Sequence, residues 1–222
     1  MKIISWNIER PKIDKKLAKN KFIIEQINLL EPDIIFLTET NSIIDFGNEY
    51  YTIKSEELPK IHDNQKYEQG ENRVTIFSKY KFVNIYETYD KFTSVSGKVK
   101  TEFGELNLYG SIIGSFGGRD IHFKNDLKNQ KIDIIKLNGN ICYSGDFNIS
   151  FSGIPYPDKQ TINKINEFFD ENNLLNLTCK NENCAIHIVV NKDFIIGKKT
   201  ETKMTLIERK ISDHNLVLTE II

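Results

Sequence analysis

The chain is poor in arginine. Its 222 residues carry 30 basic and 31 acidic side chains, a formal net charge of −1, and only Arg10, Arg73, Arg119 and Arg209 are arginines. Because the guanidinium fork suits phosphates better than an ammonium does, the sequence predicts no broad arginine-rich face. The balanced charge excludes capture of nucleic acid by bulk positive field, and it also excludes an acidic disordered tail.

Cysteine and long apolar runs are also scarce. Cys142, Cys179 and Cys184 are an odd number and too few for a disulfide scaffold. No apolar run approaches the roughly 18 residues that span a membrane. The first residues read as a strand rather than as a signal peptide. We therefore expect a cytoplasmic protein with no membrane partner, folded as one domain over residues 1–222.

The apolar pattern changes period repeatedly along the chain, which is typical of an α/β protein. It predicts three helices, over about 14–30, 123–137 and 160–172. The predicted strands cover 2–8, 33–38, 50–54, 73–78, 82–89, 94–100, 105–113, 140–144, 174–178, 185–190, 194–200, 203–208 and 215–221. Strands outnumber helices, so we expect two mixed β-sheets packed face to face with helices on the outer faces, a four-layer sandwich. The polar stretch 40–72 is predicted to be a long surface loop.

Four short polar segments interrupt apolar strands at their ends, where functional side chains are often placed. These segments are residues 5–9, 37–40, 144–148 and 212–214. Each has an ordinary structural explanation when taken alone, such as an Asx-turn made by Asp146 or a buried, satisfied His214.

Together, the four segments supply three carboxylates, two amides and one imidazole: Glu39, Asp146, Asp213, Asn7, Asn148 and His214. Such an oxygen-rich set suits a hard cation such as Mg²⁺, whereas a cysteine–histidine cluster would have indicated zinc. One Mg²⁺, one carboxylate base and one histidine suffice for the attack of water on a phosphodiester.

The order of these motifs carries a family resemblance. Trp-Asn-Ile, then Leu-x-Glu-Thr, then Ser-Gly-Asp-Phe-Asn and finally Ser-Asp-His, spread over residues 5–217, resemble the endonuclease/exonuclease/phosphatase superfamily with its deoxyribonuclease-I-like fold. Residues 72–79 also resemble the central strand of that family.

The resemblance implies a role for each residue. Glu39 would be the principal ligand of Mg²⁺ (or Mn²⁺), with Asn7 beside it and Asp213 nearby. Asp146 would orient or deprotonate the attacking water. Asn148 would hydrogen-bond a phosphate oxygen, and His214 would stabilise the developing charge on the scissile phosphate. The implied activity is a metal-dependent phosphodiesterase, with nucleic acid as its expected substrate.

Two positions depart from the family pattern. Ile186 stands where many members carry an aspartate that orients the catalytic histidine, although a one-residue slip in the alignment would leave His187 in register. Ile112 stands where many members place a histidine or tyrosine that touches the phosphate. Tyr109 is a candidate substrate contact on the same strand, but its side chain would face away from that of Ile112, and a role in the core is the alternative.

Two further features have both a functional and a structural interpretation. Arg119 follows a glycine-rich loop that precedes a helix, so it is a candidate phosphate contact, although the glycines could simply form a turn. Cys179 and Cys184 with His187 lack a fourth ligand for a metal clip, which favours ordinary loop cysteines.

Three hypotheses about function remain open at this point. The first is a nuclease, and the second is a small-molecule or lipid phosphodiesterase or phosphatase that uses the same site. The low arginine content slightly favours the second. The third is a catalytically impaired binding or regulatory module, suggested by Ile186 and Ile112. Residues 40–72 are the main place where specificity could reside.

Overall fold

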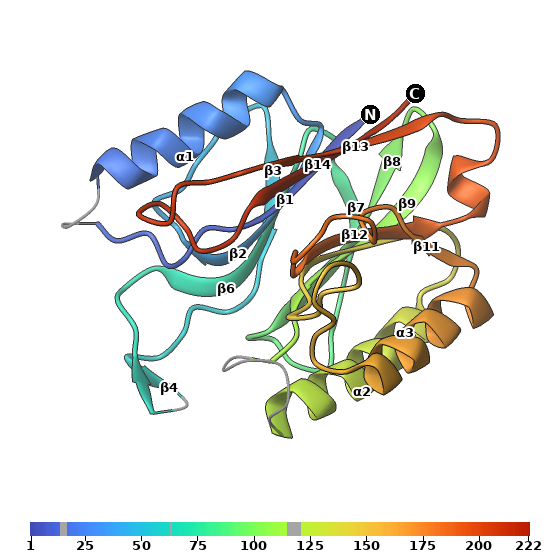
Figure 1. Ribbon diagram of the computed structural model, residues 1–222. Coiled ribbons are helices and arrows are strands. Elements are labelled where there is room, and N and C mark those ends of the chain that lie inside the picture. The colour runs from blue at the N-terminus through green and yellow to red at the C-terminus, as the bar shows by residue number, and fades with distance from the viewer. Residues whose placement is uncertain (14–16, 63, 115–120) are drawn as a thin grey trace.

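Two β-sheets packed face to face form the centre of the protein, and helices lie outside them (Figure 1). This computed structural model describes residues 1–13, 17–62, 64–114 and 121–222. The four-layer sandwich of two mixed sheets is confirmed.

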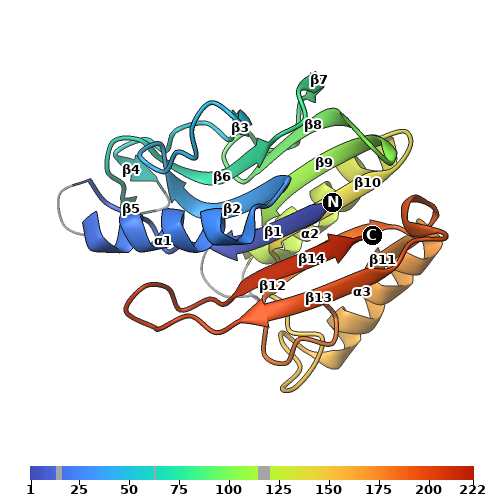
Figure 2. The ribbon, with the colours of Figure 1, turned by 90° about the horizontal axis from the view of Figure 1, so that it is seen from above.

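The first sheet has six strands. In spatial order they are β13 (Thr200–Thr205), β14 (Leu216–Ile221), β1 (Lys2–Asn7), β2 (Ile34–Asn41), β6 (Glu71–Ser78) and β3 (Tyr51–Lys54). Figure 2 shows this order from above. β1 and β2 are parallel and the other neighbours are antiparallel. A parallel pair needs a crossover, which is supplied by α1 (Leu17–Leu30) on the outer face of this sheet.

The second sheet also has six strands. Their order is β11 (Leu174–Asn176), β12 (Ile186–Asn191), β10 (Ile141–Asp146), β9 (Gly104–Ile112), β8 (Ser94–Thr101) and β7 (Phe82–Tyr86). β9 and β10 are its parallel pair, and α2 (Ile121–Lys136) connects them. α2 and α3 (Lys159–Glu171) cover the outer face through an apolar cluster that includes Phe123, Ile165 and Phe169.

The central core lies between the two sheets and explains why the strands read as nearly continuous apolar runs. Ile3, Phe36 and Ile76 of the first sheet pack with Leu108 and Ile188 of the second, and all five are fully buried. With one face of each sheet against the other and helices on the outer faces, few positions of the central strands face water, whereas the edge strands β3, β7 and β13 are largely exposed. Among the described residues, no helix is both long and apolar enough to cross a membrane.

Some predicted boundaries were wrong. The predicted strand 194–200 is instead a short 3-10 turn, η1 (Asp193–Ile195), with Phe194 buried. Gly197, with φ +74°, turns the chain before β13 begins. The predicted loop 40–72 does contain the predicted short strand, observed as β3, but it also contains a small hairpin that was not predicted, β4 (Ile61–His62) and β5 (Gln65–Lys66). Residues 14–16 of the predicted first helix lie outside the described residues.

The glycine in the Ser-Gly-Asp-Phe-Asn motif is required by the close approach of two parallel strands. Gly145 has φ +142°, and a Cβ built there would lie 1.9 Å from the carbonyl oxygen of Ser111 on β9. Backbone cannot retreat as a flexible side chain can. Only glycine fits at position 145, and it is this glycine that allows β10 to continue to Asp146 beside β9.

We predict that Gly145→Ala destabilises the protein by about 3 kcal/mol or more, since it adds a backbone clash to an unfavourable φ. Gly104→Ala is the matched control, because Gly104 has φ +112° and a Cβ added there would meet no atom within 4 Å. It should cost about 1–2 kcal/mol, from backbone strain alone. Urea unfolding followed by circular dichroism measures both, and equal losses would contradict this account.

Candidate active site

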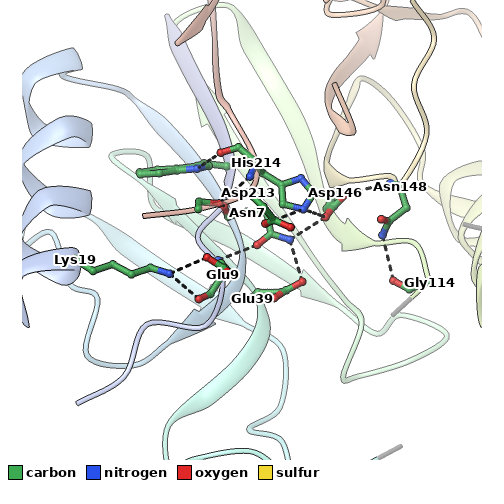
Figure 3. Close-up of polar contacts among 11 residues, drawn as sticks. Asn7, Glu9, Lys19, Glu39, Gly114, Asp146, Asn148, Asp213 and His214 are labelled. Atoms are coloured by element: carbon green, nitrogen blue, oxygen red, sulfur yellow. Dashed lines mark hydrogen bonds and ion pairs between the residues drawn. The ribbon is translucent and has the colours of Figure 1, made fainter. Parts of the chain in front are cut away.

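The predicted site residues converge where strands of both sheets end (Figure 3). Asn7 is the last residue of β1, and Glu39 follows its register partner Thr38 on β2. Asp146 is the last residue of β10 in the other sheet, and His214 precedes β14. Residues far apart in sequence therefore meet at one edge of the sandwich.

Asn7 connects the acidic side chains of the two sheets. Its Nδ2 donates to Asp146 Oδ2 at 2.8 Å and to Glu39 Oε1 at 3.1 Å, and its Oδ1 accepts from the backbone N–H of Glu9 at 2.9 Å. Asn7 is fully buried. Both ends of its amide are thus satisfied, and its orientation is fixed by these bonds.

Glu39 lies in an environment that disfavours its charge. Burial is the largest cause of the rise in its pKa, and the nearby carboxylates of Asp146 and Asp213 raise it further. The hydrogen bond from Asn7 and the imidazole of His214 act in the opposite direction. A carboxylate held among other carboxylates is an arrangement that a bound metal ion stabilises.

Asp146 is buried and held by two donors. Its Oδ2 accepts from Asn7, and its Oδ1 accepts from the backbone N–H of Asn148 at 3.0 Å, which is the predicted Asx-turn. Asn148 has φ +51°, and its Nδ2 donates to the carbonyls of Ile113 at 3.0 Å and Gly114 at 3.3 Å. Asn148 therefore ties Asp146 to the end of β9.

His214 faces the two aspartates. Its Nε2 lies 3.5 Å from Asp146 Oδ2 and 3.5 Å from Asp213 Oδ1. Its backbone is fixed on both sides: its N–H donates to Ser212 Oγ at 3.0 Å, and its carbonyl accepts from Trp6 Nε1 at 3.1 Å. The imidazole is mostly covered but still reaches solvent, whereas Asp213 is more than half exposed.

The family's histidine-orienting aspartate has no counterpart at Ile186. Ile186 is fully buried in the core between the sheets, opposite Asp146 in the β10–β12 register. Among the described residues, none forms a hydrogen bond with Nδ1 of His214.

His187 is a satisfied core residue. Its Nε2 lies 2.9 Å from the carbonyl of Ile149 and its Nδ1 lies 2.9 Å from Thr178 Oγ1. Burial lowers its pKa to about 4, so the ring is neutral near pH 7. The three cysteines are free, and no metal-binding group of three or more His, Cys, Asp or Glu side chains is found within the described ranges.

The two predicted substrate contacts have different outcomes. Tyr109 is fully buried, donates its hydroxyl to Asp133 Oδ2 at 2.9 Å and packs against Tyr143. The predicted substrate contact at Tyr109 is wrong, because alternation on a strand does not distinguish a core face from a site face. Arg119 lies outside the described residues.

Sequence reasoning missed the wall of a cavity beside Glu39. This cavity of about 330 Å³ is lined by residues that include Glu39, Asp213, Arg10, Tyr67, Glu71 and Arg73. Arg10 pairs with the buried Glu71 at 2.8 Å and stacks over the Tyr67 ring at 4.4 Å. The only sequence signal was the polar stretch 40–72, which does supply part of this wall.

The donor set fits a divalent ion that keeps several of its own waters. Glu39 is buried beside the carboxylate of Asp146, and Glu39 and Asp213 line the same cavity. Asn7 points its NH₂ rather than its oxygen at the acids, so in this arrangement it positions Glu39 instead of offering a ligand. Mg²⁺ commonly binds through one or two carboxylates together with water and substrate phosphate.

Solved structures share this architecture, whereas no family model and no curated protein matches the sequence. An endonuclease/exonuclease/phosphatase from Beutenbergia cavernae aligns with a TM-score of 0.70 and 15% identity, over 99% of this chain and 70% of that one. The endonuclease domain of the telomere-specific retrotransposon TRAS1 gives 0.66 and 14%, over 99% and 97%. The Neisseria 3′ phosphatase NExo, bound to a product DNA hairpin, gives 0.64 and 13%, over 100% and 99%.

At sequence identities of 13–15%, the similarity to these solved structures establishes the fold alone. The chain has the fold of the endonuclease/exonuclease/phosphatase structures, and the resemblance drawn from the four motifs is confirmed at that level.

We predict that Glu39→Gln raises the melting temperature of the metal-free protein by a few degrees at about pH 7.5. Burial raises the pKa of Glu39 in the folded state. The neutral carboxyl therefore costs the folded protein nothing at low pH, whereas the ionised carboxylate lowers the free energy of unfolding once the pH rises through that raised pKa. The gain should therefore vanish near pH 4, where the native carboxyl is also neutral. Scanning calorimetry in chelator measures it. Glu87→Gln is an exposed control that should show no gain, and an equal effect of both substitutions would refute the explanation.

Proposed function

We propose that the chain is a divalent-metal-dependent phosphodiesterase that hydrolyses nucleic acid at this site. The observation that carries the proposal is the buried bridge from Asn7 to both Glu39 and Asp146, with His214 facing Asp146. Two of the similar structures, an endonuclease domain and a 3′ phosphatase bound to DNA, support the choice of substrate class.

The substrate's charge explains why a cation is needed. A phosphodiester is anionic, and a site with three neighbouring carboxylates would repel it. Glu39, with Asp213 beside it, would hold a Mg²⁺ or Mn²⁺ ion. When bound, that ion supplies charge neutralisation and polarises the phosphoryl oxygen.

Asp146 is the candidate base. Hydrogen bonds from Asn7 and from the backbone of Asn148 orient its carboxylate, so it can accept a proton from a water molecule as the water oxygen attacks phosphorus. The P–O bond to the leaving alkoxide then breaks. His214 would direct Nε2–H at a phosphate oxygen and stabilise the charge that develops there.

We propose a more limited part for Asn148 than the resemblance implies. Its side-chain NH₂ already donates to two backbone carbonyls, so its contribution here is the backbone N–H that holds Asp146. The phosphate contact implied by the resemblance stays a prediction, as does that of Arg119.

Ile186 favours a second candidate, a catalytically impaired binding or regulatory module. Without a carboxylate at that position, His214 relies on its backbone bonds and on Nε2 contacts for its orientation. An imidazole whose ring is less firmly held is a poorer charge stabiliser. This candidate predicts metal and nucleic-acid binding without hydrolysis.

Mg²⁺-dependent cleavage of an oligonucleotide and of bis(p-nitrophenyl) phosphate tests the roles. Glu39→Gln, Asp146→Asn and His214→Ala should each lower kcat/KM by about 100-fold or more, and chelator should abolish activity. Glu87→Gln should retain wild-type rates. Retention of full activity by the three site variants would overturn the proposal, and binding without cleavage by the wild type would favour the second candidate.

A further inference from the structure

The exposed surface of α2 is basic even though the helix contains acids. Asp126 and Asp133 both point inward: Asp126 accepts from the hydroxyl of Tyr89 at 2.6 Å and from the N–H of Gly114 at 2.8 Å. Asp133 accepts from the N–H of Tyr89 and from the hydroxyl of Tyr109. The charges that α2 presents to solvent are therefore those of its lysines.

Three of these lysines line a groove between α2 and α3, which run side by side (Figure 1). The groove has a volume of about 700 Å³. Its floor is apolar, with Phe123, Leu127 and Pro157. Its basic rim consists of Lys124, Lys128, Lys131 and Lys164.

Most of the positive charge on the rim is available to a ligand. Lys124, Lys128 and Lys164 are exposed, and no carboxylate within the described residues forms an ion pair with them. Lys131 is more firmly held, since its Nζ donates to the carbonyl of Lys164 at 3.3 Å and lies 4.8 Å from the centre of the Phe168 ring.

The groove contains one acid among its described lining residues. Asp158 begins α3, and its carboxylate accepts from the backbone N–H of Thr161 at 2.8 Å and from the Thr161 hydroxyl at 3.0 Å. This carboxylate is thus engaged in capping the helix, and the groove keeps an excess of positive charge.

The groove begins next to the active site. Gly114 accepts from Asn148 through its carbonyl, and a Cβ on Gly114 would lie 3.2 Å from Cβ of Phe123 on the groove floor. Gly114 therefore lies between Asn148 of the active site and Phe123 of the groove. Along α2, Lys124, Lys128 and Lys131 share one face and span about 10 Å.

We infer that this groove holds a nucleic-acid strand whose scissile phosphate lies in the active site, which rests on the proposed function. Successive lysines along one line suit the successive backbone phosphates of a nucleic-acid strand. The site thereby gains local attraction for a polyanion in a chain of net charge −1.

Binding of a fluorescent single-stranded oligonucleotide, followed by anisotropy in chelator, tests the groove without any need for catalysis. In about 0.1 M salt, Lys124→Ala with Lys128→Ala should weaken binding about tenfold and reduce the slope of log K against log salt by about 1.4. The control is Lys54→Ala with Lys203→Ala, on the two edge strands of the first sheet, which removes equal charge. This control should weaken binding by less than about twofold and should leave the slope of log K against log salt unchanged.

Kinetics separate this inference from the proposed function. In the double groove variant, kcat/KM for the oligonucleotide should fall about tenfold more than kcat/KM for bis(p-nitrophenyl) phosphate. If neither substrate is cleaved by the wild type but the groove variant alone loses oligonucleotide binding, the groove stands and the proposed function fails. Equal losses in the control, unchanged binding in the groove variant, or equally tight binding of a polyglutamate peptide would each overturn the groove assignment.

Discussion

The hydrogen bond between Asn7 and Asp146 is the contact on which the site depends. It joins the last residue of β1 in one sheet to the last residue of β10 in the other, across 139 positions of sequence and out of contact with water. The same Asn7 side chain holds Glu39, and its backbone carbonyl accepts from Ser212 Oγ at 2.7 Å. Ser212 in turn fixes the backbone of His214. Because the two sheets pack together, these hydrogen bonds place Glu39, Asp146 and His214 next to one another.

The charge of the protein is arranged locally rather than in bulk. The centre of the site is acidic, and the surface of α2 nearby is basic because its two aspartates are turned toward the core. A net charge of −1 conceals this separation. The balanced charge still excludes capture of nucleic acid by bulk field, but it is compatible with a metal site flanked by a short lysine-lined groove.

The sequence could predict the sandwich and the convergence of its polar strand ends, because apolar runs and strand-end motifs are local signals. It could not predict that residues 193–195 form a 3-10 turn and that Gly197 turns the chain before β13, since the apolar residues 194–196 fit a strand as well as a turn. Tyr109 is buried because its face of β9 packs against α2, and the sequence of β9 does not show which of its two faces the helix covers. The pairing of Arg10 with Glu71 joins residues 61 positions apart, and no local pattern encodes it.

The central claim is that Glu39, held through Asn7 against Asp146, forms a divalent-metal site. Titration of Mn²⁺ followed by electron paramagnetic resonance measures bound and free ion directly. The account predicts one bound ion per chain in the wild-type protein and loss of that ion in Glu39→Gln, with Glu87→Gln unchanged. Equal binding by the wild-type and Glu39→Gln proteins, or binding by neither, would contradict it.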